Sequence, residues 1–250
     1  MIQVSFSGGR SSSMMAKIML DNYERDDLLF TFANTGKEMP ETLDFVHECD
    51  QRWNLGVVWI EYDQETKYRI VSRETASLDG RPFAELIEKK GYLPNRVARF
   101  CTADLKVRPM KAYIMDLGFE YWDTAIGIRY DEPRRYHKLK ANQGKDRWDY
   151  VFPLYDMRIT QQMVQDFWKS QPFDLGIPSQ YGNCDFCFLK GLQKKTRQAH
   201  EMPERLEWWI EQEAKVGARF HNDFSYADLK TLALNATLFE QPEIGCFCGD

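Results

Sequence analysis

The stretch that decides the fold is residues 2–15, which read IQVSFSGGRSSSMM. A short β-rich run, Ile2 to Phe6, stops at Ser7-Gly8-Gly9, and serines then lead into a helix-forming run near Met14. The pattern predicts a strand, a glycine turn and a helix, with the glycines allowing the backbone to approach a ligand closely. Unpaired N–H groups and the positive dipole end of such a helix favour an anion, most naturally a phosphate. A tight βα turn capped by a serine is the alternative without a ligand.

Two common phosphate-binding motifs are excluded, because the stretch has neither the spacing of a P-loop nor that of a dinucleotide fold. It resembles instead the Ser-Gly-Gly-x-x-Ser signature of the PP-loop nucleotide enzymes. That resemblance implies that phosphates are held by Ser7, Gly8, Gly9, Arg10, Ser11 and Ser12. Many relatives have Lys-Asp where this chain has Arg10-Ser11, and a guanidinium fork differs in geometry from a lysine's point charge.

Length, composition and charge limit the classes of protein to which this chain can belong. A chain of 250 residues with 43% hydrophobic content can bury one large core. A net charge of −5 argues against a general nucleic-acid coat protein, although a local basic groove would be hidden in that sum. No stretch approaches the roughly 20 apolar residues of a membrane span, and no signal peptide is visible. We therefore expect a cytoplasmic protein with no membrane partner.

Apolar runs that alternate with helical patterns predict an α/β fold. After the first strand, further strands are expected at residues 28–33, 57–62, 121–126 and, as an edge strand, 150–154. Strand–helix–strand order implies right-handed parallel crossovers. We expect a mostly parallel, twisted, Rossmann-like sheet flanked by helices over residues 1–155. A helical, cysteine-containing C-terminal region follows over residues 156–250, most simply as part of one integrated domain.

Two segments are harder to interpret. Residues 63–100 predict a loop with a short helix around 82–90, and residues 138–148 predict a polar connection. Ligands of parallel sheets bind beyond the carboxyl ends of the strands. We therefore expect Ser7-Gly8-Gly9 and Asn34-Thr35-Gly36, each following a strand, to meet at one site.

Six cysteines without a signal peptide indicate thiol or metal chemistry more than a disulfide scaffold. Cys49 lies at helical spacing with apolar residues and is expected to be a buried core thiol. The remaining five are Cys101, the Cys-x-x-Cys pair Cys184 and Cys187, and the tail residues Cys246 and Cys248. Three or four converging thiolates fit a [4Fe–4S] cluster best and zinc second. A redox dithiol and cysteines without a metal stay open as alternatives.

Five blocks in order resemble the phosphoadenosine phosphosulfate (PAPS) reductase family of PP-loop proteins, between Ser5 and about Lys190. The blocks are Ser7-Gly8-Gly9, Asn34-Thr35-Gly36 with Pro40-Glu41-Thr42, Cys101 with Leu105-Lys106 and Pro109, Gly127-Ile128-Arg129 with Glu132 and Arg135, and Gly182-Asn183-Cys184 with Cys187. Asn34 stands where the family usually has an acid. The resemblance implies a bound adenine nucleotide, namely ATP, APS or PAPS. Besides the PP-loop, its ligands would be Asn34, Thr35, Gly36, Gly127, Arg129 and Arg135.

The resemblance also implies roles for the cysteines and two cations. Metal ligands would be Cys101, Cys184, Cys187 and Cys246, and catalytic groups would be Cys248, Lys106 and Arg129. Two departures bear on these roles. Cluster-bearing reductases have adjacent cysteines where this chain has Phe100-Cys101, and they end in Glu-Cys-Gly-Leu-His where this chain has only Cys248-Gly249.

The best interpretation is an APS or PAPS reductase-like oxidoreductase with an iron–sulfur cluster and a thioredoxin-like reductant as partner. One alternative is an ATP-dependent, AMP-forming sulfurtransferase acting on nucleic acid. Cys101, Cys184 and Cys187 would then leave one iron open, and the basic stretch 190–197 could touch a phosphate backbone. A second alternative is a nucleotide-sensing module without activity, since fold does not fix function. A homodimer is also compatible with the sequence.

Overall fold

The central element is a six-stranded sheet with the strand order β4-β3-β2-β1-β5-β6. In this computed structural model, residues 1–178 and 181–235 are described. The strands are β1 (Ile2–Ser5), β2 (Leu28–Asn34), β3 (Val58–Asp63), β4 (Lys67–Val71), β5 (Trp122–Ala125) and β6 (Trp148–Val151). Every neighbouring pair is parallel except β3–β4. The predicted mostly parallel α/β sheet is confirmed, and the predicted edge strand begins two residues earlier as β6.

The first strand lies in the middle of the sheet, where Ile2 is paired with Leu28 of β2 and with Asp123 of β5. Both faces of β2 are covered, and Phe30 and Phe32 are buried. Burial on both faces explains why the strand sequences are continuous apolar runs and not alternating ones.

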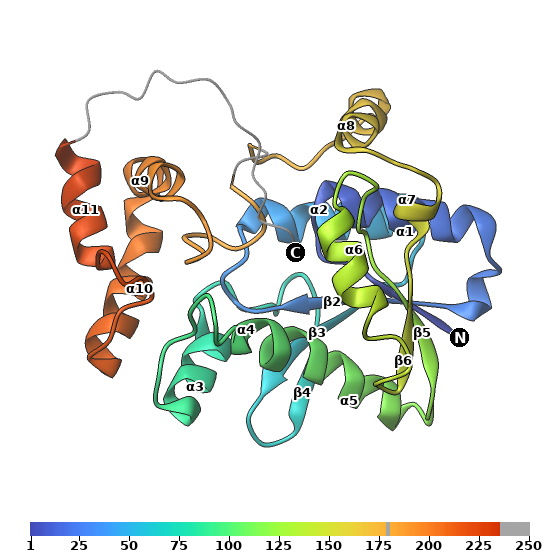
Figure 1. The fold of residues 1–250 in the computed structure, drawn as a ribbon, viewed down its shortest axis with the longest axis horizontal. Coiled ribbons are helices and arrows are strands. Elements are labelled where there is room, and N and C mark those ends of the chain that lie inside the picture. The colour runs from blue at the N-terminus through green and yellow to red at the C-terminus, as the bar shows by residue number, and fades with distance from the viewer. Residues whose placement is uncertain (179–180, 236–250) are drawn as a thin grey trace.

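Helices cover both faces of the sheet (Figure 1). One face carries α1 (Arg10–Asn22), α2 (Pro40–Trp53), α7 (Pro153–Asp156) and α8 (Gln161–Ser170). The other carries α3 (Arg81–Lys90), α4 (Phe100–Thr102), the π-helical turn η2 (Ala103–Val107) and α5 (Arg108–Asp116). A short 3-10 turn, η1 (Arg25–Asp27), precedes β2, and α6 (Pro133–Lys140) follows β5. At one end of the sheet stand α9 (Leu192–Glu201), α10 (Pro203–Val216) and α11 (Tyr226–Asn235).

Two large apolar clusters hold these layers together. The first lies between the sheet and helices α1, α2 and α8, where Trp168 packs edge-on against Phe45 with ring centroids 4.8 Å apart. The buried thiol of Cys49 belongs to this cluster, as predicted. The second joins α3 to the C-terminal helices, and there Trp209 contacts both Phe83 and Tyr226. The division of the chain at residue 155 stays a prediction, and the second cluster links the two parts.

Two elements correct the sequence interpretation. Residues 67–71 are not loop but the antiparallel strand β4, joined to β3 by a turn in which Asp63 accepts bonds from the backbone N–H groups of Glu65 and Thr66. Lys67 has a φ of 74°, which lets the chain reverse within a few residues. The polar connection also begins with a helix, α6, that has no apolar stripe to signal it. Among the described residues, no helix is long and apolar enough to cross a membrane.

Candidate nucleotide and thiol site

The glycine turn after β1 is built as the motif requires. Gly8 has a φ of 80°, in the left-handed region that favours glycine. A Cβ atom there would lie 2.6 Å from Cγ2 of Thr42 on α2, so no larger residue fits without movement. Gly9 is extended and α1 begins at Arg10, which places the amino end of a 13-residue helix directly beyond the turn. The N–H groups and positive dipole end of that helix are suited to an anion.

Serine hydroxyls fix the shape of this PP-loop. Ser12 Oγ accepts hydrogen bonds from the N–H of Ser7 (3.2 Å) and from its hydroxyl (2.9 Å). The hydroxyls of Ser12 and Ser13 both donate to the carbonyl of Gly9, at 2.8 and 3.0 Å. These bonds preorganise the loop before any ligand binds.

The loop after β5 closes against the PP-loop, as expected for strands with a common carboxyl edge. A Cβ atom on Gly127 would lie 3.0 Å from Cα and 3.1 Å from N of Ser12, so the two backbones are in close contact. Arg129 Nη1 donates to Ser11 Oγ at 3.1 Å. The structure thus brings the predicted residues Ser11, Ser12, Gly127 and Arg129 together.

Asn34 faces the interior of the sheet and not the crevice. Its side-chain amide donates to Glu61 Oε1 (2.6 Å) and to the carbonyl of Ser77 (2.8 Å), while its Oδ1 accepts from the N–H of Gly36 (3.2 Å). Glu61 is fully buried and also pairs with Arg69. An acid at position 34 would meet the Glu61 carboxylate, whereas an amide can donate to it. The departure from the family pattern therefore has a local cause.

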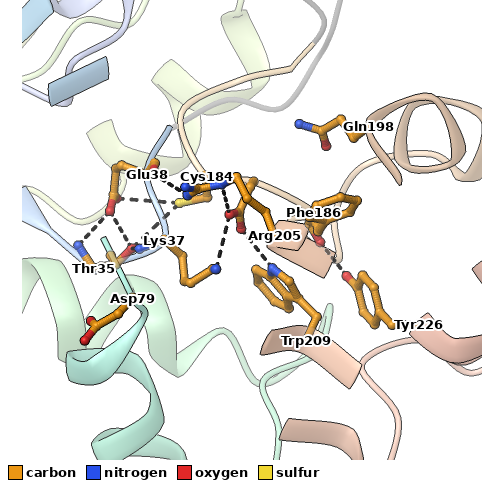
Figure 2. Close-up of polar contacts among 12 residues, drawn as sticks. Thr35, Lys37, Glu38, Asp79, Cys184, Phe186, Gln198, Arg205, Trp209 and Tyr226 are labelled. Carbon is orange, nitrogen blue, oxygen red and sulfur yellow. Dashed lines mark hydrogen bonds and ion pairs between the residues drawn. The ribbon is translucent and has the colours of Figure 1, made fainter. Parts of the chain in front are cut away.

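The carboxylate of Glu38 links the β2 loop to the cysteines. Its Oε2 accepts from the N–H and hydroxyl of Thr35 at 2.8 and 2.7 Å. Its Oε1 lies 3.5 Å from Lys106 Nζ and 3.6 Å from the thiol of Cys184 (Figure 2). Cys184 Sγ is also 4.0 Å from Thr35 Oγ1. The side chains of Thr35, Lys106 and Cys184 thus converge on one buried carboxylate.

The Cys-x-x-Cys segment is attached to both nucleotide loops. Residues 38 and 184 form an isolated antiparallel bridge, in which the N–H of Met39 donates to the carbonyl of Asn183 at 2.9 Å. The side-chain amide of Asn183 donates to the carbonyl of Ser7 in the PP-loop at 2.6 Å. Segments about 145 to 175 residues apart in sequence therefore share one site.

A buried acid between the two cysteines anchors this segment to the C-terminal helices, and sequence reasoning missed it. Asp185 is fully buried and accepts from Arg205 Nε (2.7 Å) and Trp209 Nε1 (2.8 Å), while Lys37 Nζ lies 3.2 Å away (Figure 2). Arg205 also donates to the carbonyl of Glu38 at 2.8 Å. The only sequence signals were an acid inside the Cys-x-x-Cys motif and the charged pair Lys37-Glu38 directly after a strand.

Two of the predicted thiols are influenced by a third. Burial raises the pKa of Cys184 well above its usual range, and the Glu38 and Cys187 charges raise it further against the opposing Lys106 charge. Burial also raises the pKa of Cys101, and the Cys187 charge adds to that shift. Cys101 and Cys184 therefore both lie within electrostatic reach of Cys187.

Their donor chemistry suits iron–sulfur or zinc, but a preformed metal centre is not seen. Among residues 1–178 and 181–235, no group of three or more His, Cys, Asp or Glu side chains is arranged to hold a metal ion. Cys246 and Cys248 lie outside the described residues. The cluster, zinc and the roles of the tail cysteines stay predictions.

Two predicted nucleotide ligands are engaged with other groups. Arg10 forms a two-bond ion pair with Asp174 (2.7 and 2.8 Å) and donates to the carbonyl of Leu175 at 2.6 Å. Arg135 Nη1 donates to Glu132 Oε1 at 2.6 Å, and Glu132 also accepts from the N–H of Arg129. A nucleotide contact from Arg10 would require its guanidinium to leave Asp174.

The family model of the phosphoadenosine phosphosulfate reductase domain matches residues 1–174. The chain belongs to this family. The match spans the PP-loop, the β2 loop, Cys101, Lys106 and the Arg129 loop. The Cys-x-x-Cys segment of this PAPS reductase-family protein lies just beyond the matched residues.

Two similar proteins carry no established activity. An uncharacterized nin region protein of Escherichia phage lambda is 35% identical over 202 residues, covering 76% of this chain and 67% of that protein. An uncharacterized protein of Methanocaldococcus jannaschii is 30% identical over 162 residues, which are 64% of this chain. The chain spans only about a third of that archaeal protein, 34% of its length.

One solved structure is also similar to this chain. The phosphate complex of PAPS reductase from Candida auris is 13% identical, with a TM-score of 0.43, over 67% of this chain and 71% of that one.

Proposed function

We propose that this protein is an adenine-nucleotide-dependent enzyme of sulfur chemistry whose reaction is the reduction of a sulfonucleotide, APS or PAPS. The observation that carries the proposal is the hydrogen bond between Asn183 and the carbonyl of Ser7. It attaches the cysteine segment directly to the phosphate-binding loop, so that nucleotide and thiols share one site.

The nucleotide phosphates bind at the amino end of α1. Backbone N–H groups of the PP-loop and the hydroxyl of Ser11 supply neutral donors, and Arg129 supplies a positive charge beside Ser11. Lys106, next to Glu38, supplies a second positive charge on the side of Thr35 and Cys184. A sulfonucleotide with its phosphate at Arg129 and its sulfate toward Lys106 would be polarised for attack at sulfur.

The nucleophile must be a thiolate, and Cys101 and Cys184 are poorly suited to that task. Burial raises the pKa of both Cys184 and Cys101, which keeps them protonated in the absence of a metal. The resemblance to the family points instead to Cys248 in the tail. Its thiolate would attack the sulfonucleotide sulfur, forming an S–S bond while the S–O bond breaks and its electron pair leaves on the phosphate oxygen.

The product of that step is a cysteine thiosulfonate, with AMP or its 3′-phosphorylated form released. An external dithiol of thioredoxin type then attacks the cysteine sulfur, releases sulfite and is itself oxidised to a disulfide. The positive charges of Lys106 and Arg129 stabilise the departing phosphate.

An iron–sulfur cluster or zinc would be held by Cys101, Cys184 and Cys187, with Cys246 as the fourth ligand. When bound, it would keep these sulfurs deprotonated and tie together the segments that carry them. Asp185, Arg205 and Lys37 position the segment that carries two of these ligands. A cytoplasmic location and a homodimer are part of the same proposal.

Sulfur transfer to a nucleic acid with consumption of ATP is the second candidate. The observation that favours it is that two thiols of the described residues, Cys101 and Cys184, both lie within electrostatic reach of a third, Cys187. Three ligands leave a coordination position for sulfide. In this reaction the nucleotide site would adenylate the acceptor and release pyrophosphate.

The test uses full-length protein purified without oxygen. Sulfite release from APS and from PAPS is measured with thioredoxin and its reductase, for the wild type, for Cys248→Ser and for Cys49→Ser as a core-thiol control. Reduction predicts sulfite that Cys248→Ser abolishes and Cys49→Ser preserves. AMP and pyrophosphate formed from ATP only with a nucleic-acid acceptor would establish the second candidate instead. Nucleotide binding by calorimetry without either turnover would indicate a sensing module.

A further inference from the structure

The surface that the nucleotide site leaves unexplained is helix α6 (Pro133–Lys140) and the loop after it. Residues 133–145 contain no carboxylate, although acidic residues outnumber basic ones in the whole chain, 38 to 33. Their positive side chains are Arg134, Arg135, Lys138, Lys140 and Lys145. A net charge of −5 thus hides one strongly basic segment.

The first turn of this helix departs from the usual electrostatic preference, whereas the basic residues of its last turn conform to it. Its first turn contains no acidic residue, and Arg134 and Arg135 lie at the end where the helix dipole is already positive. Arg134 and Lys138 are four residues apart on one face, where like charges repel. Every residue of α6 lies at least partly at the surface, so packing in a core does not account for the sequence. Local conflicts of this kind are typical of functional surfaces.

Aromatic rings hold the helix rigidly in place. Tyr136 stacks face to face on Tyr155 of α7, with centroids 3.8 Å apart and planes within 1°, and packs edge-on against Phe152. Tyr155 in turn contacts Tyr130, with centroids 5.1 Å apart. Tyr130 is 44% exposed and thus presents a supported ring to solvent.

The basic helix is continuous with the phosphate site. Arg129 bonds to Ser11 of the PP-loop, Glu132 accepts from the N–H of Arg129, and Arg135 of α6 donates to Glu132. Tyr130 directly follows Arg129 in the chain. A polyanion lying along α6 would therefore reach the edge of the nucleotide site.

We propose that α6 and the exposed ring of Tyr130 form a binding surface for single-stranded nucleic acid. Arginines and lysines on a rigid helix neutralise backbone phosphates. The exposed ring of Tyr130, packed against the ring of Tyr155, offers a flat face on which a nucleic-acid base can stack. This combination favours an unpaired nucleic acid over an acidic protein, which has no planar bases. The inference goes beyond sulfonucleotide reduction and does not depend on it.

The test measures binding alone, without nucleotide or reductant. The fluorescence anisotropy of a labelled 12-nucleotide single strand, in DNA and RNA forms, is titrated with full-length protein at several NaCl concentrations. A duplex and a poly-glutamate peptide of equal charge serve as competing probes. The variants are Arg134→Glu/Lys138→Glu, Tyr130→Ala and Tyr130→Phe. The charge-matched control is Lys169→Glu/Lys215→Glu, which changes two exposed lysines on α8 and α10.

We expect Arg134→Glu/Lys138→Glu to weaken single-strand binding at least tenfold, an order-of-magnitude figure, and the control to stay within about twofold. The slope of log affinity against log salt should become shallower by about 1.4, since each single-strand phosphate contact contributes about 0.7. Tyr130→Ala should lower the affinity for the single strand about fivefold or more, and Tyr130→Phe should change it little, because stacking needs the ring and not the hydroxyl.

The melting temperature of each variant shows whether a loss of binding results from a loss of folding. The substitution at Arg134 adds a carboxylate to the first turn, where the helix dipole favours it, but the two new carboxylates repel each other as the two cations did, so the Arg134→Glu/Lys138→Glu variant should melt close to the wild type. The proposal is overturned by a wild type that does not bind at low salt, by equal losses in variant and control, or by full affinity in Tyr130→Ala. Preference for the poly-glutamate peptide over the oligonucleotide would overturn it as well. Sulfite release plays no part in the assay, so failure of the reductase proposal leaves this test intact.

Discussion

The two loops at the carboxyl edge, Ser7-Gly8-Gly9 after β1 and Asn34-Thr35-Gly36 after β2, follow neighbouring strands but are built differently. The first is shaped by glycine and by serine hydroxyls, and its N–H groups lie at the start of a helix. The second is fixed by buried carboxylates, because Glu61 holds Asn34 and Glu38 holds Thr35. The comparison fits the proposal that the first loop receives the nucleotide, whereas the second joins the sheet to the cysteine segment. Substitutions in the first loop should therefore lower the affinity for the nucleotide, whereas substitutions around the second loop should lower the free energy of unfolding.

The largest effect is expected where the second loop meets the C-terminal helices. Asp185→Ala removes the carboxylate shared by Arg205, Lys37 and Trp209 and leaves buried cations without their partner. Breaking one side of a buried charge network typically costs about 3–5 kcal/mol in the free energy of unfolding. Urea unfolding at neutral pH measures the loss.

Asp166→Ala is the matched control, because that carboxylate is exposed and its pair with Lys169 should contribute little to the free energy of unfolding. The loss in free energy of unfolding for Asp185→Asn should lie between the losses for Asp185→Ala and Asp166→Ala, since Asn keeps an acceptor for Trp209 but loses the charge. A loss below about 1 kcal/mol in Asp185→Ala would mean that the network is not what joins the two regions.

The next effect belongs to the first loop and should appear in ligand binding. Gly127→Ala places a methyl group about 3 Å from the backbone of Ser12, so the PP-loop has to shift. Overpacking of this kind costs about 1–3 kcal/mol, and we expect the affinity for ATP or APS to fall by roughly tenfold or more. Isothermal titration calorimetry measures it directly.

Gly191→Ala is the control for Gly127→Ala. No heavy atom lies within 4 Å of the added methyl group, and the residue has an ordinary φ of −64°. Its nucleotide affinity should equal that of the wild type. Unchanged affinity in Gly127→Ala would place the phosphates away from the contact between the β1 and β5 loops.

The sequence predicted the first region better than the second, for a physical reason. Strand–turn–helix at residues 2–15 is a local pattern, and apolar runs such as Leu28–Ala33 report burial directly. Parallel topology then places the ends of β1, β2 and β5 at one edge. That topology is sufficient to predict that Ser12, Gly127 and Arg129 lie together.

The second region depends on contacts between distant segments, which leave little trace in local sequence. The pairing of Asp185 with Lys37 and Arg205 joins three such segments, and each residue alone resembles a solvated surface charge. Strand β4 was missed because Lys67–Val71 is an edge strand with mixed exposure and no apolar run. Helix α6 was missed because it has no buried face from which a period could be read.

A smaller effect on nucleotide affinity should distinguish Arg10 from Arg129, two of the arginines that the family resemblance assigns to the nucleotide. Arg129→Ala should weaken nucleotide binding about five- to tenfold, because it removes the charge beside Ser11. Arg10→Ala should leave the affinity within about twofold and lower the free energy of unfolding by about 1 kcal/mol, since it loses a half-exposed ion pair with Asp174. Calorimetry and urea unfolding of both variants give the two readouts. If Arg10→Ala weakens binding as much as Arg129→Ala, the guanidinium leaves Asp174 for the nucleotide.

The smallest effect concerns Cys49, in the core beneath the first loop. Burial raises the pKa of its thiol well above the usual range, so the folded protein keeps it protonated. The unfolded chain loses that proton above about pH 8.5, and stability due to this group is lost as pH rises further, by up to about 1.4 kcal/mol per unit. Cys49→Ala removes this dependence at the cost of a small cavity near neutral pH.

The difference in unfolding free energy between the wild type and Cys49→Ala should accordingly favour the wild type at pH 7 and shrink between pH 8.5 and 10, both approximate bounds from the thiol's unfolded pKa. Measuring that difference cancels the similar contributions of Cys101 and Cys184, which both proteins retain. A difference that stays constant with pH would show that the thiol ionises in the folded state. The core beneath the PP-loop would then admit water, and the first loop would not be the rigid, preorganised partner in the comparison.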